Sequence, residues 1–180
     1  MNILGLVKVL AELDADRLND IGKWIKRCSG TIYTVGNGGS ASTAEHAATG
    51  FSKPGTDLVS CKRSVCLSSN SSLLTAWAND RSYDESYADM LPTISNNDIL
   101  ICISVSGNSA NILNIVSKFL GSSNKAKIVG LLGSEKVVHE IFTQANEARM
   151  KCMFVDSNDY GVVEVAHLAI CHIWSDMLKR

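Results

Sequence analysis

Two short segments of this chain carry residue types that hold a phosphate group. Residues 36–40 (GNGGS) follow the apolar run 31–35, and residues 104–109 (SVSGNS) follow the apolar run 99–103. A glycine turn between a strand and a helix points backbone N–H groups at an anion, and serine hydroxyls add directional hydrogen bonds. Two such loops at the ends of two strands predict a phosphorylated ligand at one edge of a parallel sheet.

The first loop also fits the loose pattern of a dinucleotide-binding turn, with Gly36, Gly38 and Ala41 at the three small positions. That pattern requires an acidic residue at the end of the next strand to hold the ribose. The next apolar run, 64–67, is instead followed by the uncharged residues 68–70 (SSN). A Walker-type glycine loop ending in Gly-Lys-Ser/Thr is absent from the sequence. We therefore expect no nucleotide cofactor.

The elements that must position these loops alternate along the chain. We expect helices over 3–28 (one or two), 40–49, 70–79, 85–91, 109–120, 137–144 and 161–178, and strands over 31–35, 64–67, 98–103, 127–132 and 152–155. Gly50 is expected to weaken or end the helix over 40–49, and residues 51–62 are expected to form a loop. Short apolar strands that alternate with helices predict an α/β fold with a parallel sheet.

Bulk composition limits the other classes of function. The 180 residues fit a single domain spanning 1–180. The formal net charge of −1, without a basic stripe, gives no reason to expect nucleic acid. We find no apolar run near the ~20 residues of a membrane span, and we expect the apolar N-terminal residues to form a helix and not a signal peptide. The six cysteines form no CxxC pair and lie mostly in apolar runs, which favours the reducing cytoplasm.

Four motifs in order resemble one known family. They are GNGGS at 36–40, AND at 78–80, SxSGNS at 104–109, and Val163-Glu164-x-x-His167-x4-His172. This set is similar to the sugar isomerase (SIS) family, and within it to the phosphoheptose isomerases, which act on sedoheptulose 7-phosphate. The resemblance runs from about residue 3 to the end of the chain. It implies a three-layer αβα sandwich with a five-stranded parallel sheet.

The resemblance also implies where the ligand binds and how the chain assembles. It implies a homotetramer with active sites between subunits, in which the N-terminal helical segment 1–28 packs at an interface. The implied phosphate ligands are Ser40, Ser104, Ser106 and Ser109. The implied sugar ligands are Asn37, Gly38, Gly39, Asn79 and Asp80.

The family's metal and catalytic positions are only partly conserved here. By position, His46 and His172 match the family's two histidines, Glu164 stands in place of a glutamine, and Gly50 stands in place of a glutamate. Glycine can neither carry a proton nor bind a metal, so Glu164 is the substitute that the sequence offers, with His172 as its catalytic partner. His46, Glu164 and His172 could bind zinc with an open position, or could form a metal-free acid/base set.

Purely structural roles for some of these side chains stay open. His46 lies among alanines and could be a buried structural histidine, and His167 could face the core or an interface. The three tryptophans are expected to pack in the core or an interface.

These observations favour a cytoplasmic aldose–ketose isomerase that converts sedoheptulose 7-phosphate to an aldoheptose 7-phosphate for surface polysaccharide. The alternative is a non-catalytic sugar-phosphate-binding or regulatory SIS protein that acts through protein partners. Gly50 is the feature that sustains the alternative.

Overall fold

The computed structural model describes residues 2–55, 60–91, 93–122, 125–144 and 146–179, and its strands form one parallel sheet in the order β2-β1-β3-β4-β5. The strands are β1 (Thr31–Gly36), β2 (Arg63–Cys66), β3 (Ile99–Ser104), β4 (Lys127–Leu132) and β5 (Met150–Phe154). The chain reverses its direction of travel across the sheet between the neighbours β1 and β3. The loops that follow these two strands therefore open side by side, which is where parallel sheets of this kind bind ligands.

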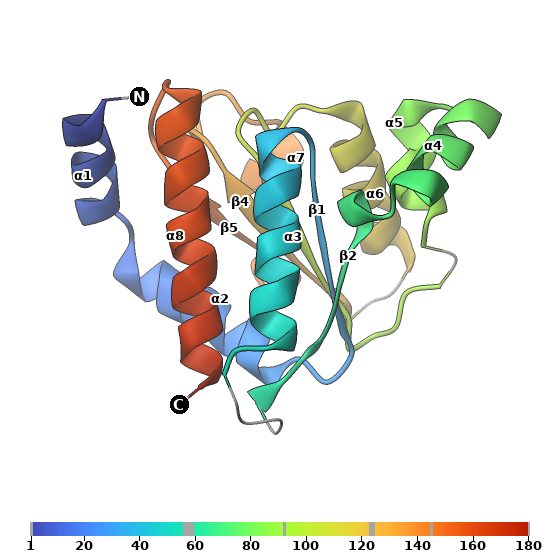
Figure 1. Cartoon of the computed structure of the whole chain (residues 1–180), viewed down its shortest axis with the longest axis horizontal. Coiled ribbons are helices and arrows are strands. Elements are labelled where there is room, and N and C mark those ends of the chain that lie inside the picture. The colour runs from blue at the N-terminus through green and yellow to red at the C-terminus, as the bar shows by residue number, and fades with distance from the viewer. Residues whose placement is uncertain (1, 56–59, 92, 123–124, 145, 180) are drawn as a thin grey trace.

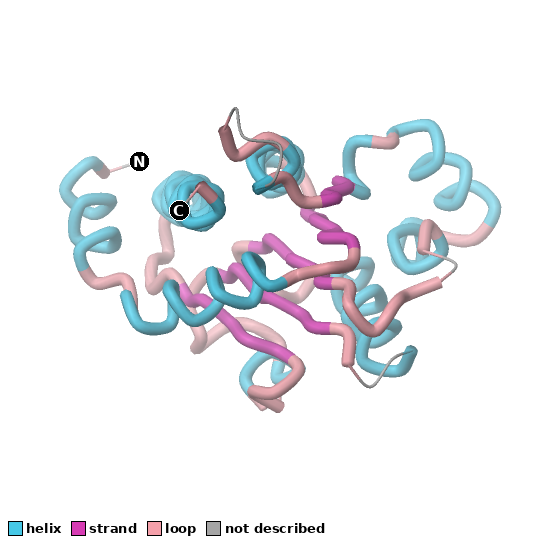
Figure 2. Tube along the Cα trace, turned by 90° about the horizontal axis from the view of Figure 1, so that it is seen from below, coloured by secondary structure: helices cyan, strands magenta, loops and turns pink. Residues whose placement is uncertain are grey.

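Helices cover both faces of the sheet. They are α1 (Ile3–Ala11), α2 (Ala15–Arg27), α3 (Gly39–Ser52), α4 (Ser71–Asp80), α5 (Tyr83–Asp89), α6 (Ala110–Ser122), α7 (Glu140–Thr143) and α8 (Tyr160–Leu178), with a 3-10 turn η2 (Leu67–Ser69). The helices α1, α2, α3 and α8 cover one face, and α4 to α7 cover the other. Figure 2, seen along the strands, shows the sheet between these two layers.

The central strand β3 explains why the sheet is buried on both sides. Its side chains alternate, so Ile99, Ile101 and Ile103 enter the core beneath α3 and α8, while Leu100 and Cys102 enter the core beneath α6. All are almost completely buried. A continuous apolar run is what a strand needs when both of its faces are covered.

The predicted α/β fold with five parallel strands is confirmed, and the structure corrects several boundaries. The helical region 3–28 is two helices, the helix expected over 85–91 begins at Tyr83, and the one expected over 137–144 shrinks to α7. Ser82 explains the early start of α5, because its hydroxyl accepts the backbone N–H of Glu85 at 3.2 Å. Residues 56–59 of the expected loop lie outside the described residues.

The expectation that Gly50 ends its helix is wrong. Helix α3 continues to Ser52, and the hydroxyl of Ser175 on α8 donates to the carbonyl of Gly50 at 2.9 Å. Glycine costs a helix roughly 1 kcal/mol relative to alanine. Packing of α3 against α8 outweighs that cost here.

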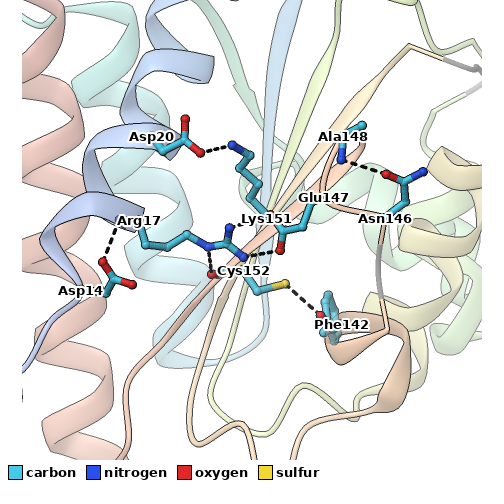
Figure 3. Close-up of polar contacts among 9 residues, drawn as sticks. All are labelled: Asp14, Arg17, Asp20, Phe142, Asn146, Glu147, Ala148, Lys151 and Cys152. Carbon is cyan, nitrogen blue, oxygen red and sulfur yellow. Dashed lines mark hydrogen bonds and ion pairs between the residues drawn. The ribbon is translucent and has the colours of Figure 1, made fainter.

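Charged side chains fix α2 to the edge strand β5 (Figure 3). The guanidinium of Arg17 donates to both carboxylate oxygens of Glu147 at 2.6 Å, and its Nε donates to the carbonyl of Cys152 at 2.9 Å. Lys151 on β5 pairs with Asp20 on α2. The Arg17 hydrogen bond lowers the pKa of Glu147. These contacts hold α2 across the start of the sheet.

Helix α8 has the length and hydropathy of a membrane span, so the expectation that no such segment exists was too strict. Half of its most apolar stretch is buried inside the structure. Trp174, for example, is fully buried and donates its indole N–H to the carbonyl of Leu18 at 3.0 Å. The apolar composition of α8 is accounted for by its packing against α1, α2 and α3.

His167 is a core residue, as one of the two interpretations of the sequence proposed. It is fully buried on α8, and its Nε2 lies 3.0 Å from the carbonyl oxygen of Leu132. No partner for its Nδ1 exists among the described residues. Burial lowers the pKa of His167 from 6.5 to about 4, against the opposing effect of the Leu132 hydrogen bond.

This buried imidazole predicts a pH-dependent loss of stability. Between pH 6.5 and pH 4 the unfolded chain binds a proton at this residue that the folded chain excludes, so the free energy of unfolding falls as the pH falls through that window. The total effect is roughly 3 kcal/mol. His167→Gln, which retains a donor for Leu132, should remove this component in urea unfolding experiments, whereas the control His139→Gln at an exposed site should retain it. Identical pH profiles for all three proteins would contradict the assignment.

Candidate functional site

The two predicted loops lie next to each other at the carboxyl ends of β1 and β3. Each contains a glycine with positive φ, +53° at Gly38 and +63° at Gly107, a conformation that L side chains rarely adopt. Each loop leads directly into a helix, α3 after the first and α6 after the second. The unpaired backbone N–H groups of both helix starts are therefore available near the same place.

A cavity of about 240 Å³ lies between these loops and the start of α8. Its polar lining is Asn37, Ser40, Ser104, Ser106, Ser109, Tyr160 and Glu164. Six of these seven residues were predicted site residues. The structure thus brings together side chains from three separate parts of the sequence.

The serine hydroxyls are oriented by the loop that carries them. Ser104 Oγ accepts the N–H of Gly107 at 3.1 Å, and Ser106 Oγ accepts the N–H of Asn108 at 3.3 Å. Each hydroxyl that accepts in this way keeps its own proton to donate. Ser104 and Ser40 are buried, so a bond from either to a ligand would form away from bulk water.

Hydrogen bonds from two helices hold the side chain of Asn37 in place. Its amide and the buried amide of Asn111 on α6 exchange two hydrogen bonds, at 2.9 and 3.0 Å. The hydroxyls of Tyr83 and Tyr87 on α5 also donate to Asn37 Oδ1, at 2.9 and 3.3 Å. Burial raises the pKa of Tyr87 to about 12, so this hydroxyl stays a donor at neutral pH. The Asn37–Asn111 pair thus joins the two ligand loops directly.

Glu164 projects from the first turns of α8 onto the start of α3. A Cβ atom on Gly39 would lie only 2.3 Å from Glu164 Oε1, so the carboxylate lies directly against the backbone of Gly39. Asp159 fixes the start of α8 by accepting the N–H of Gly161 at 2.9 Å. Glu164 is the one carboxylate that lines the cavity, among the residues the structure describes.

The two predicted histidines form a separate pair. The rings of His46 on α3 and His172 on α8 are 4.7 Å apart between centroids and meet edge to face. Both residues are exposed. His46 therefore approaches His172 within the same chain and is not the buried structural histidine that the alternative proposed.

The three predicted metal ligands do not meet in one chain. Glu164 and His172 are eight residues apart on a straight helix, about 12 Å along its axis, and Glu164 points onto Gly39. Across the described ranges, no group of three His, Cys, Asp or Glu side chains is placed to hold a metal. Two imidazoles are too few for a zinc site, which takes at least three protein ligands. A metal would need further ligands from another chain.

Gly50, the departure from the family pattern, lies on the same helix as His46 and one turn further along. A Cβ atom there would lie 3.2 Å from the hydroxyl of Ser175, so position 50 faces α8 and not open solvent. The structure therefore leaves no side chain at position 50 that could move a proton.

Asn79 and Asp80 stand apart from the cavity. Both are exposed at the end of α4, where the amide of Asn79 donates to Asp80 at 3.2 Å, and neither lines the cavity.

The sequence analysis did not identify four residues that line or support the cavity, namely Tyr83, Tyr87, Asn111 and Tyr160. Asn111 carried one usable signal, because it lies in the first turn of the helix just after Ser109.

Comparisons with known proteins agree with this fold. The family model of the SIS domain matches residues 2–133. The chain belongs to the SIS domain family.

Its similar proteins in that family include several phosphoheptose isomerases. It is 34% identical over 156 residues to the phosphoheptose isomerase of Helicobacter pylori strain P12, covering 84% of this chain and 75% of that protein. It is 32% identical over 154 residues to the one of Shewanella piezotolerans, covering 83% and 74%. A phosphoheptose isomerase structure from Francisella tularensis superposes with a TM-score of 0.83 at 21% identity, covering 98% and 91% of the two chains.

The serine loop predicts a measurable binding defect. Ser104→Ala and Ser106→Ala should each weaken the binding of inorganic phosphate by about 0.5–3 kcal/mol, the span from a neutral to a charge-assisted hydrogen bond. Isothermal titration calorimetry measures this change. Ser117→Ala, an exposed serine on α6 that bonds only its own helix, is the matched control. Unchanged affinity in both loop variants would remove this loop from the site.

Proposed function

We propose that this protein is an aldose–ketose isomerase that interconverts sedoheptulose 7-phosphate and an aldoheptose 7-phosphate. Two kinds of observation support the proposal. The relatives above are named phosphoheptose isomerases, and the serine-lined cavity at two helix starts has the chemistry of a phosphate site. The resemblance to phosphoheptose isomerases implies that this reaction supplies heptose for surface polysaccharide.

The phosphate would be held by neutral groups. Ser40, Ser104, Ser106 and Ser109 offer hydroxyls, and the first turns of α3 and α6 offer backbone N–H groups and the positive ends of two helix dipoles. Such a set binds a dianion without placing a fixed cation beside the reacting carbons. Asn37, held in place by Asn111 and the two tyrosines, would donate its remaining N–H to the sugar.

Isomerisation requires a group that moves a proton between C1 and C2 through an enediol. Glu164 is the carboxylate in position to do so, because it lines the cavity and approaches the loop at Gly39. A carboxylate also repels the phosphate that the same cavity holds. We therefore place Glu164 against the sugar carbons, with the phosphate at the serine loop.

His172 would serve the second acid/base step, at the carbonyl oxygens. It lies about 12 Å along α8 from Glu164 and is exposed, so a neighbouring copy of the chain could bring its own histidine to this cavity. A homotetramer with shared sites is the assembly we propose. The exposed apolar side chains of α1, among them Ile3, Leu4 and Val7, support an interface at that helix.

Zinc would join this site only if a second chain completed the His46–His172 pair. No step of the mechanism above depends on it. We place the protein in the cytoplasm, which suits its six free cysteines. A non-catalytic sugar-phosphate sensor that acts through protein partners is the second candidate, and the missing side chain at Gly50 is the observation that favours it.

Glu164→Gln separates catalysis from binding. The variant should lose isomerisation of sedoheptulose 7-phosphate, because an amide cannot accept the proton. It should bind inorganic phosphate at least as tightly as the wild type, because a like charge has been removed. Conversion is followed by 31P NMR and binding by calorimetry.

The matched control is Glu45→Gln on α3, an exposed glutamate that does not line the cavity. It should change neither quantity. Weaker phosphate binding with unchanged turnover in the Glu164 variant would overturn its catalytic role. A wild-type protein that binds phosphate but converts no sugar would favour the sensor.

A further inference from the structure

A second cavity lies at the opposite edge of the sheet, where β1, β3 and β4 begin. Its volume is about 380 Å³, within the range of small-molecule sites. Its charged lining residues are Arg27, Lys125, Lys127, Arg149 and Asp98, and Trp24 forms part of the wall. Four basic side chains and one acidic side chain make it strongly positive, whereas the whole protein is close to neutral.

The single carboxylate is already committed to the backbone. Asp98 is buried, and its two oxygens accept the N–H groups of Thr31 at 2.8 Å and Ser95 at 2.7 Å. The nearby Asp20 pairs with Lys151, as Figure 3 shows. Burial raises the pKa of the Cys28 thiol, so the wall supplies no thiolate either. Asp98 therefore offsets one of the four basic side chains, and the lining keeps a net positive charge.

Lys127 carries the clearest sign of this imbalance. Its ammonium lies 4.3 Å from the centre of the Trp24 ring, and that of Lys151 lies 4.5 Å from the same centre. Neither Lys127 nor Arg27 forms an ion pair with any acid of the described chain. Burial and the neighbouring cations Lys151 and Arg27 lower the pKa of Lys127. An anion in the cavity would relieve this repulsion.

Arg149 contributes charge to the wall while its donors are occupied. Its guanidinium caps the end of α6 by donating to the carbonyls of Leu120 at 3.0 Å and Phe119 at 3.1 Å. We assign Lys127 and Arg27 to the ligand, because neither pairs with an acid among the described residues. Two cations on one concave wall match two linked phosphate groups better than they match a single phosphate group.

We propose that this cavity is a second ligand site for a diphosphate group, of the kind carried by nucleoside diphosphates and by sugar diphosphates. It is separate from the serine-lined cavity, since the two lie at opposite ends of the same strands. The proposal does not depend on the isomerase activity. It gives the protein a place to respond to a second phosphorylated metabolite.

The test is an NMR titration of the 15N-labelled protein with inorganic pyrophosphate, read at the indole N–H of Trp24, which Trp24→Phe identifies. We expect a saturable shift that persists in Ser106→Ala. Lys127→Gln and Arg27→Gln should each weaken binding about tenfold, as expected for loss of a hydrogen bond to a charged group. Lys127→Arg should retain binding, which separates lost charge from lost packing. Titrations with ADP and with a sugar diphosphate distinguish the two sources.

Three outcomes would overturn the proposal. A shift that never saturates and disappears in moderate salt would show general attraction to a basic surface. A shift lost in Ser106→Ala would assign the binding to the first cavity. An equal loss in the control Lys8→Gln, an exposed lysine on α1, would show that bulk charge alone is responsible.

Discussion

The candidate site depends on the hydrogen-bonded pair of amides between Asn37 and Asn111. These residues are 74 positions apart in the sequence, yet each donates to the other across the junction of the two ligand loops. This amide pair is costly to break, because Asn111 is buried and would be left with an unsatisfied polar group. The two loops are thus held in one relative position, and the serines within them line one cavity.

The α5 helix extends that constraint. Tyr87 is buried, and its hydroxyl lies 3.0 Å from the carbonyl oxygen of Gly36 and 3.3 Å from Asn37 Oδ1, so its single proton can reach either acceptor of the first loop. Lys118 on α6 in turn donates to the carbonyl of Ala88 at the end of α5. The first loop, the start of α6 and α5 therefore form one hydrogen-bonded unit, which holds the ligand-binding groups in a fixed arrangement.

Much of the fold could be predicted from local signals. The apolar run of β4 lies between a lysine and a glycine, and its predicted bounds match the structure. The serines and glycines of both loops were recognised because their chemistry is local. Gly50 was misjudged because helix propensity is a weak effect that packing on α8 overrides. The contacts of Asn37 could not be predicted, because they join residues far apart in sequence.

The separation of Glu164 from the His46–His172 pair is the feature that helical spacing concealed. A step of eight places two residues on one face, but it also places them about 12 Å apart. One chain therefore supplies a phosphate cavity with a carboxylate, and elsewhere a pair of imidazoles. The proposed isomerase activity requires that these parts act together in one reaction.

Solvent deuterium incorporation tests that claim most directly. Sedoheptulose 7-phosphate is incubated with the protein in D2O, with and without zinc, and the product is observed by NMR. The account predicts deuterium at C2 of a new aldose, above a His172→Ala control. Saturable broadening of the sugar-phosphate signals without any exchange would contradict it and would identify a binding protein.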